Sequence, residues 1–425
     1  MRLLYRIAVT PAAGLHAALL WLRARLRGEP LAPPMAQRFG FAPPVTGRPV
    51  WIHAASVGEV QLAATLVRAL RAHYPDLPLL VTAFTPTGAA RAAATLAPEV
   101  TVRALPYDLP GPVRRFLGRT EPRLAIVLET ELWPTLFEAC RRRGLPLFIA
   151  NARLSERAAH RYRRFGTLFA PALRAAVIAA RSAEDAERFR SIGADAALTH
   201  VTGNLKFDYT PPPDLAARAR ALRTRYAEGR PLWVAGSTHD GEDAAMIAAH
   251  ARVRARLPDA VLVLAPRHPQ RFESVAAELS AQGMPYVRHS RSPDAAAAAG
   301  AAVVLLDTLG ELLDFYAAAD AAFVGGSLVP IGGHNLLEPA ALGRPVATGP
   351  SDFNAAEIAR LLLECGAARR VHDEQELGTC MLEWLHDPLE RTRVGELGRA
   401  AVETHRGALK RLLGLIGPQL GPPTA

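Results

Sequence analysis

Cysteine and lysine are both scarce in this chain. The three cysteines among its 425 residues stand far apart and form no CxxC pair. This spacing excludes a disulfide framework and a zinc knot, and it favours a reducing compartment. Only two of the fifty basic residues are lysines, Lys206 and Lys410. Because the chain otherwise uses arginine for positive charge, Lys206 stands out as a position where a compact ammonium group is wanted.

Aromatic residues are also few, at 6% of the chain, and they do not alternate with the basic runs. The basic surplus lies wholly in the first half, since residues 1–210 hold 28 basic against 15 acidic residues and the remainder holds 22 against 25. Such a surplus predicts an acidic partner. The shortage of aromatics and the absence of helix-turn-helix, RRM or zinc-finger spacing exclude nucleic acid, so an anionic lipid is the favoured partner.

Long hydrophobic runs are absent except for residues 7–22, which arginines flank on both sides. Sixteen residues fall short of the roughly 20 that span a bilayer. Trp21 and further arginines follow where a secretory signal would need a cleavage site. We therefore expect a membrane-associated helix within residues 1–30, lying in or dipping into the cytoplasmic leaflet of a membrane. Whether it spans or only docks stays open, and an ordinary first helix packed on the domain is the alternative.

Apolar strands and amphipathic helices alternate along the rest of the chain, which predicts α/β domains with parallel sheets covered on both faces. The triple proline of residues 211–213 forms a stiff linker. We therefore place the boundary near residue 210, giving two Rossmann-like domains at 31–209 and 210–425 that face each other across a ligand cleft. Strands are expected at 50–54, 79–84, 101–105, 125–128, 147–150, 175–180, 232–235, 260–264, 301–306, 321–324 and 346–348.

The segment 323–346 is the most informative part of the second half. A buried strand runs into the pairs Gly325-Gly326 and Gly332-Gly333, and His334, Asn335 and Glu338 then open a helix that ends at Gly343. Glycines permit close approach of the backbone to a ligand, and unpaired N–H groups suit an anion. The segment therefore predicts a nucleotide site, with Glu338 for ribose hydroxyls. The alternative is a tight turn with a helix cap.

Polar residues at other predicted strand ends are further candidates for the site. Ser56-Val-Gly58-Glu59 follows the first strand, where Gly58 would allow a sharp turn and Glu59 either acts as a general base or stabilises the helix start. Two acids stand next to another strand end at Glu129 and Glu131, and one of them is expected to face the cleft. Arg153 and Lys206 are candidate anion contacts or plain surface charges.

The strand ends of the second half carry cationic and hydroxyl groups. Ser237 and Thr238 make either a phosphate loop or a helix cap, and Arg267 and His268 stand between prolines as a stiff cationic pair. No cluster has metal-ligand spacing, so no metal site is predicted. A Walker loop, a G-x-G-x-x-G fingerprint and a G-x-S-x-G elbow are all absent.

Eight motifs stand at or near these strand ends: SVGE (56–59), ETELWP (129–134), NARLS (151–155), GNLKFD (203–208), AGSTHDGED (235–243), RHP (267–269), DTLGEL (307–312) and GGHNLLEPA (332–340). Taken together, these motifs resemble the 3-deoxy-D-manno-octulosonic acid (Kdo) transferases of lipopolysaccharide biosynthesis, which are two-domain GT-B glycosyltransferases. The resemblance covers about residues 50–348 and implies a location on the cytoplasmic side of the bacterial inner membrane. Gln270 and Leu336 depart from it, since Glu and Pro would be expected there, but both sit beside the site.

The resemblance implies an inverting transfer of Kdo from CMP-Kdo to a lipid A precursor, lipid IVA, with no cofactor. It implies Glu59 as the base, with Glu129 and Lys206 stabilising the transition state. Arg267, His268, Leu309, Gly310, Glu311, Asn335, Leu336, Leu337 and Glu338 would hold the CMP moiety, and Ser56, Gly58, Glu131, Arg153, Ser237, Thr238, Gly333 and His334 are possible further contacts. The alternatives are another GT-B envelope glycolipid transferase or a non-catalytic basic protein that binds anionic lipid.

Overall fold

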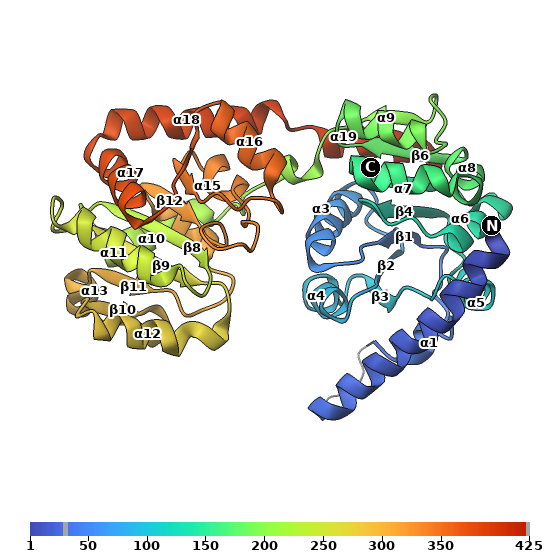
Figure 1. Cartoon of the computed structure of the whole chain (residues 1–425), viewed down its shortest axis with the longest axis horizontal. Coiled ribbons are helices and arrows are strands. Elements are labelled where there is room, and N and C mark those ends of the chain that lie inside the picture. The colour runs from blue at the N-terminus through green and yellow to red at the C-terminus, as the bar shows by residue number, and fades with distance from the viewer. Residues whose placement is uncertain (29–32, 422–425) are drawn as a thin grey trace. The chain divides into compact units, whose positions relative to one another are not determined.

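The computed structural model describes residues 1–28 and 33–421 and divides into two compact α/β units (Figure 1). Unit 1 comprises Met1–Tyr209 together with Arg406–Ala425, and unit 2 comprises Thr210–His405. The chain thus first enters unit 2 immediately before the triple proline. The expected boundary between residues 30 and 31 lies outside the described residues.

Unit 1 is built on a seven-stranded sheet in the order β3-β2-β1-β4-β5-β6-β7, and every strand pair in it is parallel. Six of these strands match the sequence-based expectation. β7 was missed because three residues at a sheet edge give little hydrophobic signal. The strands are β1 (Val50–His53), β2 (Leu79–Ala83), β3 (Thr101–Ala104), β4 (Leu124–Leu128), β5 (Leu147–Ala152), β6 (Ala176–Ala180) and β7 (Thr199–Val201).

Helices cover both faces of this sheet, since the strands are apolar on both sides. Trp51 and Val127 point to one face, where α5, α6, α8 and α9 pack, whereas Val50 and Ile52 point to the other, where α3 and α4 pack. The described helices of unit 1 are α1 (Arg2–Arg27), α2 (Met35–Arg38), α3 (Val57–His73), α4 (Pro86–Leu96), α5 (Pro110–Thr120), α6 (Pro134–Arg142), α7 (Glu156–Arg164), α8 (Gly166–Leu173), α9 (Ala183–Ser191), α19 (Ala408–Leu420) and the 3₁₀ turn η1 (Leu205–Asp208).

Unit 2 repeats this architecture with a parallel sheet in the order β10-β11-β9-β8-β12-β13-β14. The edge strands β10 and β14 have three residues each and were not predicted. The alanine-rich residues Ala295–Gly300 form the short helix α13. The strands are β8 (Leu232–Thr238), β9 (Val261–Pro266), β10 (Tyr286–Arg288), β11 (Val303–Leu305), β12 (Ala321–Val324), β13 (Val346–Thr348) and β14 (Ala368–Arg370).

The core of unit 2 is filled by Trp233, Phe323 and Trp384, which are almost completely buried. Trp384 lies on α17, which packs against α11 over one face of the sheet. The described helices are α10 (Leu215–Ala227), α11 (Asp243–Arg254), α12 (Phe272–Ala281), α13 (Ala295–Gly300), α14 (Leu312–Ala318), α15 (Leu337–Ala341), α16 (Ala356–Glu364), α17 (Glu374–His386) and α18 (Pro388–Thr404), with the 3₁₀ turns η2 (Pro269–Arg271) and η3 (His289–Arg291).

The C-terminal helix α19 belongs to unit 1, so the assignment of all of residues 210–425 to the second domain was wrong for its last part. Leu412 and Ile416 are fully buried in the core that α3 and α4 also cover. The carboxylate of Asp208 accepts hydrogen bonds from the backbone N–H groups of Gly407 (2.6 Å) and Leu409 (2.7 Å). Burial of the two apolar side chains, at roughly 1.5–3 kcal/mol each, is the physical reason for this return.

One side of helix α1 packs against unit 1, and the opposite side of the helix is uncovered. Tyr5 donates a hydrogen bond to Asp108 (2.8 Å), and His16 Nδ1 lies 3.1 Å from the hydroxyl of Tyr107. By length and composition, it is the one helix among the described residues that could cross a membrane. Its uncovered side carries the exposed apolar residues Leu3, Leu4, Ile7, Leu15, Leu19, Trp21, Leu22 and Leu26.

Candidate functional site

The carboxyl end of β1 leads directly into α3, which places Glu59 at the edge of the sheet. Ser56 is the residue before the helix, and Glu59 lies in the first helical turn. The Glu59 carboxylate accepts hydrogen bonds from the Ala55 N–H (2.8 Å) and the Ser56 hydroxyl (2.9 Å). Gly58 lies inside this first turn without a positive φ, so the sharp turn expected there was wrong.

Two other titratable side chains, Glu131 and His53, lie near Glu59 at this edge of the sheet. Burial raises the pKa of the Glu59 carboxyl, its hydrogen bonds from Ala55 and Ser56 oppose the rise, and the charge of Glu131 adds to it. Glu131 follows β4, which lies beside β1 in the sheet, and its carboxylate is 3.9 Å from Nε2 of the buried His53. His53 Nε2 has no hydrogen-bond partner within the described part of the chain. The three side chains form a cluster in which a carboxyl group is held as a stronger base than usual.

A second cluster gathers at the ends of β4, β5 and β6. Glu129 has a left-handed backbone (φ 59°), as does Asn151 (φ 53°) at the end of β5. The Asn151 side chain accepts a hydrogen bond from the Leu205 N–H (2.9 Å), which fixes the turn that carries Lys206. Burial lowers the pKa of Lys206, and the charge of Glu129 acts against that shift. Left-handed backbone at two non-glycine residues is the kind of strain that often marks functional positions.

Two arginines complete this second cluster. Arg181 and Arg153 both act on the pKa of Lys206 and lower it further after burial, because they place like charge nearby. Burial also lowers the pKa of Arg181 itself, and Glu129 opposes this. Thus Glu129 faces the cationic cluster, whereas Glu131 faces His53 and Glu59. Both acids of this loop lie at the carboxyl edge of the sheet, in neighbouring clusters.

The first glycine turn of unit 2 holds a carboxylate of the protein itself. The buried Glu242 accepts hydrogen bonds from the backbone N–H groups of Gly326 (2.7 Å), Ser327 (3.0 Å), Leu328 (2.9 Å) and His239 (2.9 Å). A Cβ on Gly325 would lie within 3 Å of atoms of residues 237, 238 and 242. These amides are therefore not free for a ligand that approaches the first glycine pair, because Glu242 already accepts their hydrogen bonds.

The second glycine pair brings His334, Asn335 and Glu338 to the sheet edge. Gly332 and Gly333 both have positive φ, and a Cβ on Gly332 would collide with Phe353. The helix begins only at Leu337, later than expected, because the Asn335 side chain turns back to accept a hydrogen bond from the Leu337 N–H (3.1 Å).

The same asparagine side chain holds the partly buried acid of this loop, Glu338. Its amide donates to the Glu338 carboxylate (3.1 Å), and burial raises the pKa of Glu338 while this hydrogen bond opposes the rise. The side chains of Leu336 and Leu337 are buried in unit 2, so any ligand contact of theirs must come from the main chain.

Three histidines meet beside this loop. His239 and His334 stack with their Nε2 atoms 2.8 Å apart, and the ring of His268 stands edge-on to His239 at 5.2 Å. Burial, with help from His239, Arg267 and His268, lowers the pKa of His334 to about 4. The pair is therefore neutral at neutral pH, with one Nε2–H donating to the other ring. His239 was missed by the sequence argument, although it stands next to the predicted Ser237 and Thr238.

The remaining predicted donor contacts lie at the ends of β8 and β11. Thr238 is buried and its hydroxyl donates to Asp243 (2.7 Å), whereas Ser237 is partly exposed with a φ of 59°. Glu311 interacts with His289 (3.4 Å), and Thr308 donates to its carboxylate. Gly310 (φ 93°) and the exposed Leu309 form an open turn before it.

The topology explains why these residues meet within each unit. Parallel strands all end at the same edge, so loops distant in sequence become neighbours there. In unit 2 the adjacent strands β11, β9, β8 and β12 bring their loops together. His53 and Arg181 follow the same rule in unit 1, and their strand-end positions were the signal that could have found them. Within residues 1–28 and 33–421, no group of three or more His, Cys, Asp or Glu side chains is arranged to hold a metal ion.

Two parallel-sheet Rossmann-like units with polar strand-end loops define a GT-B fold. Solved structures agree on the fold: the UDP-GlcNAc 2-epimerase from Neisseria meningitidis bound to UDP-GlcNAc matches with a TM-score of 0.58 at 12% identity, covering 87% of this chain and 99% of that chain. A putative UDP-N-acetylglucosamine 2-epimerase from Listeria monocytogenes matches with a TM-score of 0.53 at 15% identity, covering 88% and 96%.

Sequence relatives narrow the class. Residues 34–209 match the family described as 3-deoxy-D-manno-octulosonic-acid transferase (kdotransferase). The 3-deoxy-D-manno-octulosonic acid transferase of Haemophilus influenzae is 41% identical over 91% of this chain and 91% of its own length, and that of Bordetella pertussis is 39% identical over 98% and 99%. The chain belongs to the Kdo transferase family and is a glycosyltransferase, which confirms the resemblance seen in its motifs and rules out the non-catalytic alternative.

Proposed function

We propose that this enzyme transfers Kdo from CMP-Kdo to a lipid A precursor with inversion at the anomeric carbon. The observation that carries the proposal is the pair of clusters in unit 1. Glu59, a carboxyl with a raised pKa, lies after β1, and Glu129, which follows the neighbouring strand β4, acts on the partly buried Lys206. The identity of the transferred sugar, Kdo, follows from membership of the Kdo transferase family. The basic surplus of the first half supports an anionic lipid acceptor.

In this mechanism Glu59 acts as the general base. It takes the proton of an acceptor hydroxyl while the hydroxyl oxygen forms a bond to the anomeric carbon of Kdo. The bond from that carbon to the phosphate oxygen breaks, and CMP leaves with the electron pair. A raised pKa strengthens Glu59 as a base, and general-base catalysis typically contributes about 10²–10⁴-fold in rate.

Cationic and polar groups would stabilise the charge that develops on the leaving phosphate. We assign this role to Lys206 and Arg153, with Glu129 orienting Lys206. Arg267 and His268 would bind the CMP moiety. Glu338 would accept hydrogen bonds from the ribose hydroxyls. A leaving group with one phosphate can be satisfied by protein donors, so we propose that the transfer needs no metal ion or other cofactor.

Helix α1 would hold the enzyme on the cytoplasmic face of the inner membrane. One side of the helix is fastened to unit 1 through Tyr5 and His16, and the other side exposes large apolar residues next to arginines. An amphipathic arrangement of this kind suits a helix lying in the membrane interface. We therefore favour docking over spanning.

Substitution Glu59→Gln tests the proposed base. We expect the rate of transfer from CMP-Kdo to tetraacylated lipid A precursor, followed by mass spectrometry of the product, to fall by about 10²–10⁴-fold. The acidic limb of the wild-type kcat/KM profile should lie above the usual carboxyl value of 4.5, with activity rising as pH rises through it, because the base must be deprotonated.

Glu156→Gln is the matched control, since Glu156 also lies in the first turn of a helix but is exposed. It should transfer at the wild-type rate. Wild-type turnover in Glu59→Gln would remove Glu59 from the mechanism, and a product carrying another sugar or acceptor would favour a different envelope glycolipid transferase.

A further inference from the structure

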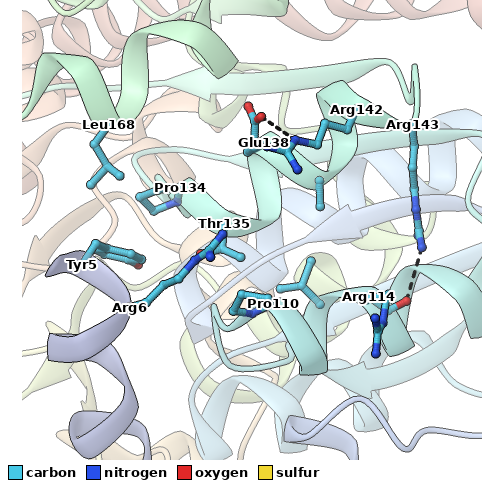
Figure 2. A pocket seen from close by; sticks show the side chains of 12 residues that line it. Tyr5, Arg6, Pro110, Arg114, Pro134, Thr135, Glu138, Arg142, Arg143 and Leu168 are labelled. Atoms are coloured by element: carbon cyan, nitrogen blue, oxygen red, sulfur yellow. Dashed lines mark hydrogen bonds and ion pairs between the residues drawn. The ribbon is translucent and has the colours of Figure 1, made fainter. Parts of the chain in front are cut away.

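A cavity of about 270 Å³ lies in unit 1 between helices α5 and α6, beside the first turns of α1 (Figure 2). None of the candidate site residues lines it. Its walls come from α1, α5, α6 and α8, on the sheet face that Trp51 and Val127 also cover. The cavity is therefore separate from the strand-end clusters described above.

The lining of this cavity is apolar on one side and cationic on the other. Figure 2 shows Tyr5, Pro134 and Leu168 on one side, with Arg114 and Arg143 across from them. Val113 and Ala139 add further apolar surface between the two helices. Such a lining suits a ligand that has both an apolar part and an anionic group.

The positive charge at the cavity is only partly neutralised by the protein. The lining holds four arginines, Arg6, Arg114, Arg142 and Arg143, against one acid. That acid, Glu138, is already bound by Arg142 Nε (2.8 Å) and by Arg141 from outside the lining. Among the residues that the structure describes, no ion pair joins the exposed Arg6, Arg114 or Arg143 to an acid, so the cavity is complementary to an anion.

The rim of the cavity is continuous with the uncovered apolar side of α1. Tyr5 and Arg6 line the cavity, and their neighbours Leu3, Leu4 and Ile7 are 68%, 64% and 60% exposed. The hydrogen bond from Tyr5 to Asp108 holds this turn in place. A membrane that received the side chains of Leu3, Leu4 and Ile7 would therefore have its headgroup layer at the mouth of the cavity.

We propose that the cavity binds one anionic phospholipid of the membrane, distinct from the glycolipid acceptor. Arg6, Arg114 and Arg143 hold its phosphate, and the glycerol and first methylene groups lie along Val113 and Leu168. A volume near the lower limit of small-molecule pockets, roughly 300 Å³, admits this part of a lipid and leaves the rest of the chains in the bilayer. The inference rests on the membrane association proposed above and not on the identity of the donor or acceptor.

The test uses the full chain in nanodiscs of phosphatidylcholine with or without phosphatidylglycerol, followed by native mass spectrometry. Wild type should retain one phosphatidylglycerol per chain. Ala139→Phe fills the cavity without changing charge, and Arg114→Gln/Arg143→Gln removes the cationic side. Each variant should reduce the retained phosphatidylglycerol at least about tenfold. In Ala139→Phe the phenyl ring takes the space of the lipid. In the double arginine variant two phosphate contacts are lost, and each contact of a basic side chain near a membrane is worth on the order of a factor of five.

Arg163→Gln/Arg164→Gln is the control, because it removes the same charge from exposed positions on α7 of the same unit. It should retain the lipid. Thermal unfolding of every variant checks that the fold is kept. Arg114→Lys/Arg143→Lys keeps the positive charge and should restore part of the binding.

Three outcomes would overturn the proposal. They are retention of phosphatidylglycerol in both cavity variants, equal retention of phosphatidylcholine by wild type, and a parallel loss in the α7 control. Transfer to a detergent-dispersed acceptor should stay within about twofold of wild type in the cavity variants. A loss there would assign the cavity to the acceptor instead, whereas failure of the transferase proposal would leave the lipid measurement unaffected.

Discussion

The carboxyl edges of the two sheets use their charged residues in different ways. In unit 2, Glu242 accepts four backbone hydrogen bonds and Asp307 binds Arg288 (2.7 Å) and Ser290, so several acids hold loops in shape. In unit 1, Glu59, Glu131 and His53 gather at one point, and Lys206 gathers with Glu129 and arginines at the next. Polar residues at strand ends are therefore of two kinds, and only their partners distinguish them.

The carboxylates of Glu242 and Glu59 also differ in how far hydrogen bonds compensate the burial of their charge. The hydrogen bonds that Glu242 accepts compensate the burial of its charge, which is the condition under which a buried carboxylate stabilises a protein. Glu59 is less well compensated, since burial still raises its pKa against two hydrogen bonds. A carboxyl kept in this state contributes less to stability and is better suited to accept a proton.

The largest expected effect comes from making the same substitution at both edges. Glu242→Gln should lower the free energy of unfolding of unit 2 by about 3–5 kcal/mol, because an amide cannot accept four hydrogen bonds and its NH₂ group faces backbone donors. Glu59→Gln should cost less than about 1 kcal/mol. Chemical denaturation measures both values, and hydrogen exchange at residues 326–328 locates the first. Equal costs would break the distinction between the two edges.

A smaller effect tests whether α19 stabilises unit 1. Leu412 is completely buried there, so Leu412→Ala should destabilise unit 1 by about 2–4 kcal/mol through lost burial and a cavity. Hydrogen exchange should accelerate in β1, β2 and β4 and stay unchanged in β8 and β9. Leu389→Ala, at a residue 84% exposed on α18, is the control and should leave both units unchanged. Faster exchange in unit 2 would show that α19 does not belong to unit 1 alone.

The smallest effect concerns an acid of unit 2 that resembles Glu59. Asn335 donates to the partly buried Glu338 and caps the turn before α15, so Asn335→Ala should raise the pKa of Glu338 further. It should weaken binding of the proposed donor by about 1 kcal/mol, or roughly fivefold in KM for CMP-Kdo. The loss should grow as pH falls, because Glu338 then becomes protonated. Steady-state kinetics at several pH values measures it. A pH-independent loss would mean that Asn335 acts only as a cap.

The order of strands and helices could be read from the sequence wherever apolar runs were long enough. Strands β1 and β4 and helix α3 are examples, whereas β7, β10 and β14 escaped because three-residue edge strands carry little pattern. The candidate site was found as a set of strand-end loops, since parallel strands end on one edge. Glu338 and Arg267 were named for that reason, Glu311 was named from the family resemblance, and the roles of all three stay predictions.

The sequence by itself determined the family, the two-unit α/β organisation and the loops that carry the chemistry, because these depend on local periodicity and on motifs. Only the tertiary structure decided which polar groups are already satisfied. The glycine turn at Gly325-Gly326 reads as a ligand cradle until Glu242, more than eighty residues earlier, is found hydrogen-bonded to its amides. The return of α19 to unit 1 is likewise non-local, since buried apolar area is gained only against a core formed by residues more than two hundred positions earlier in the chain.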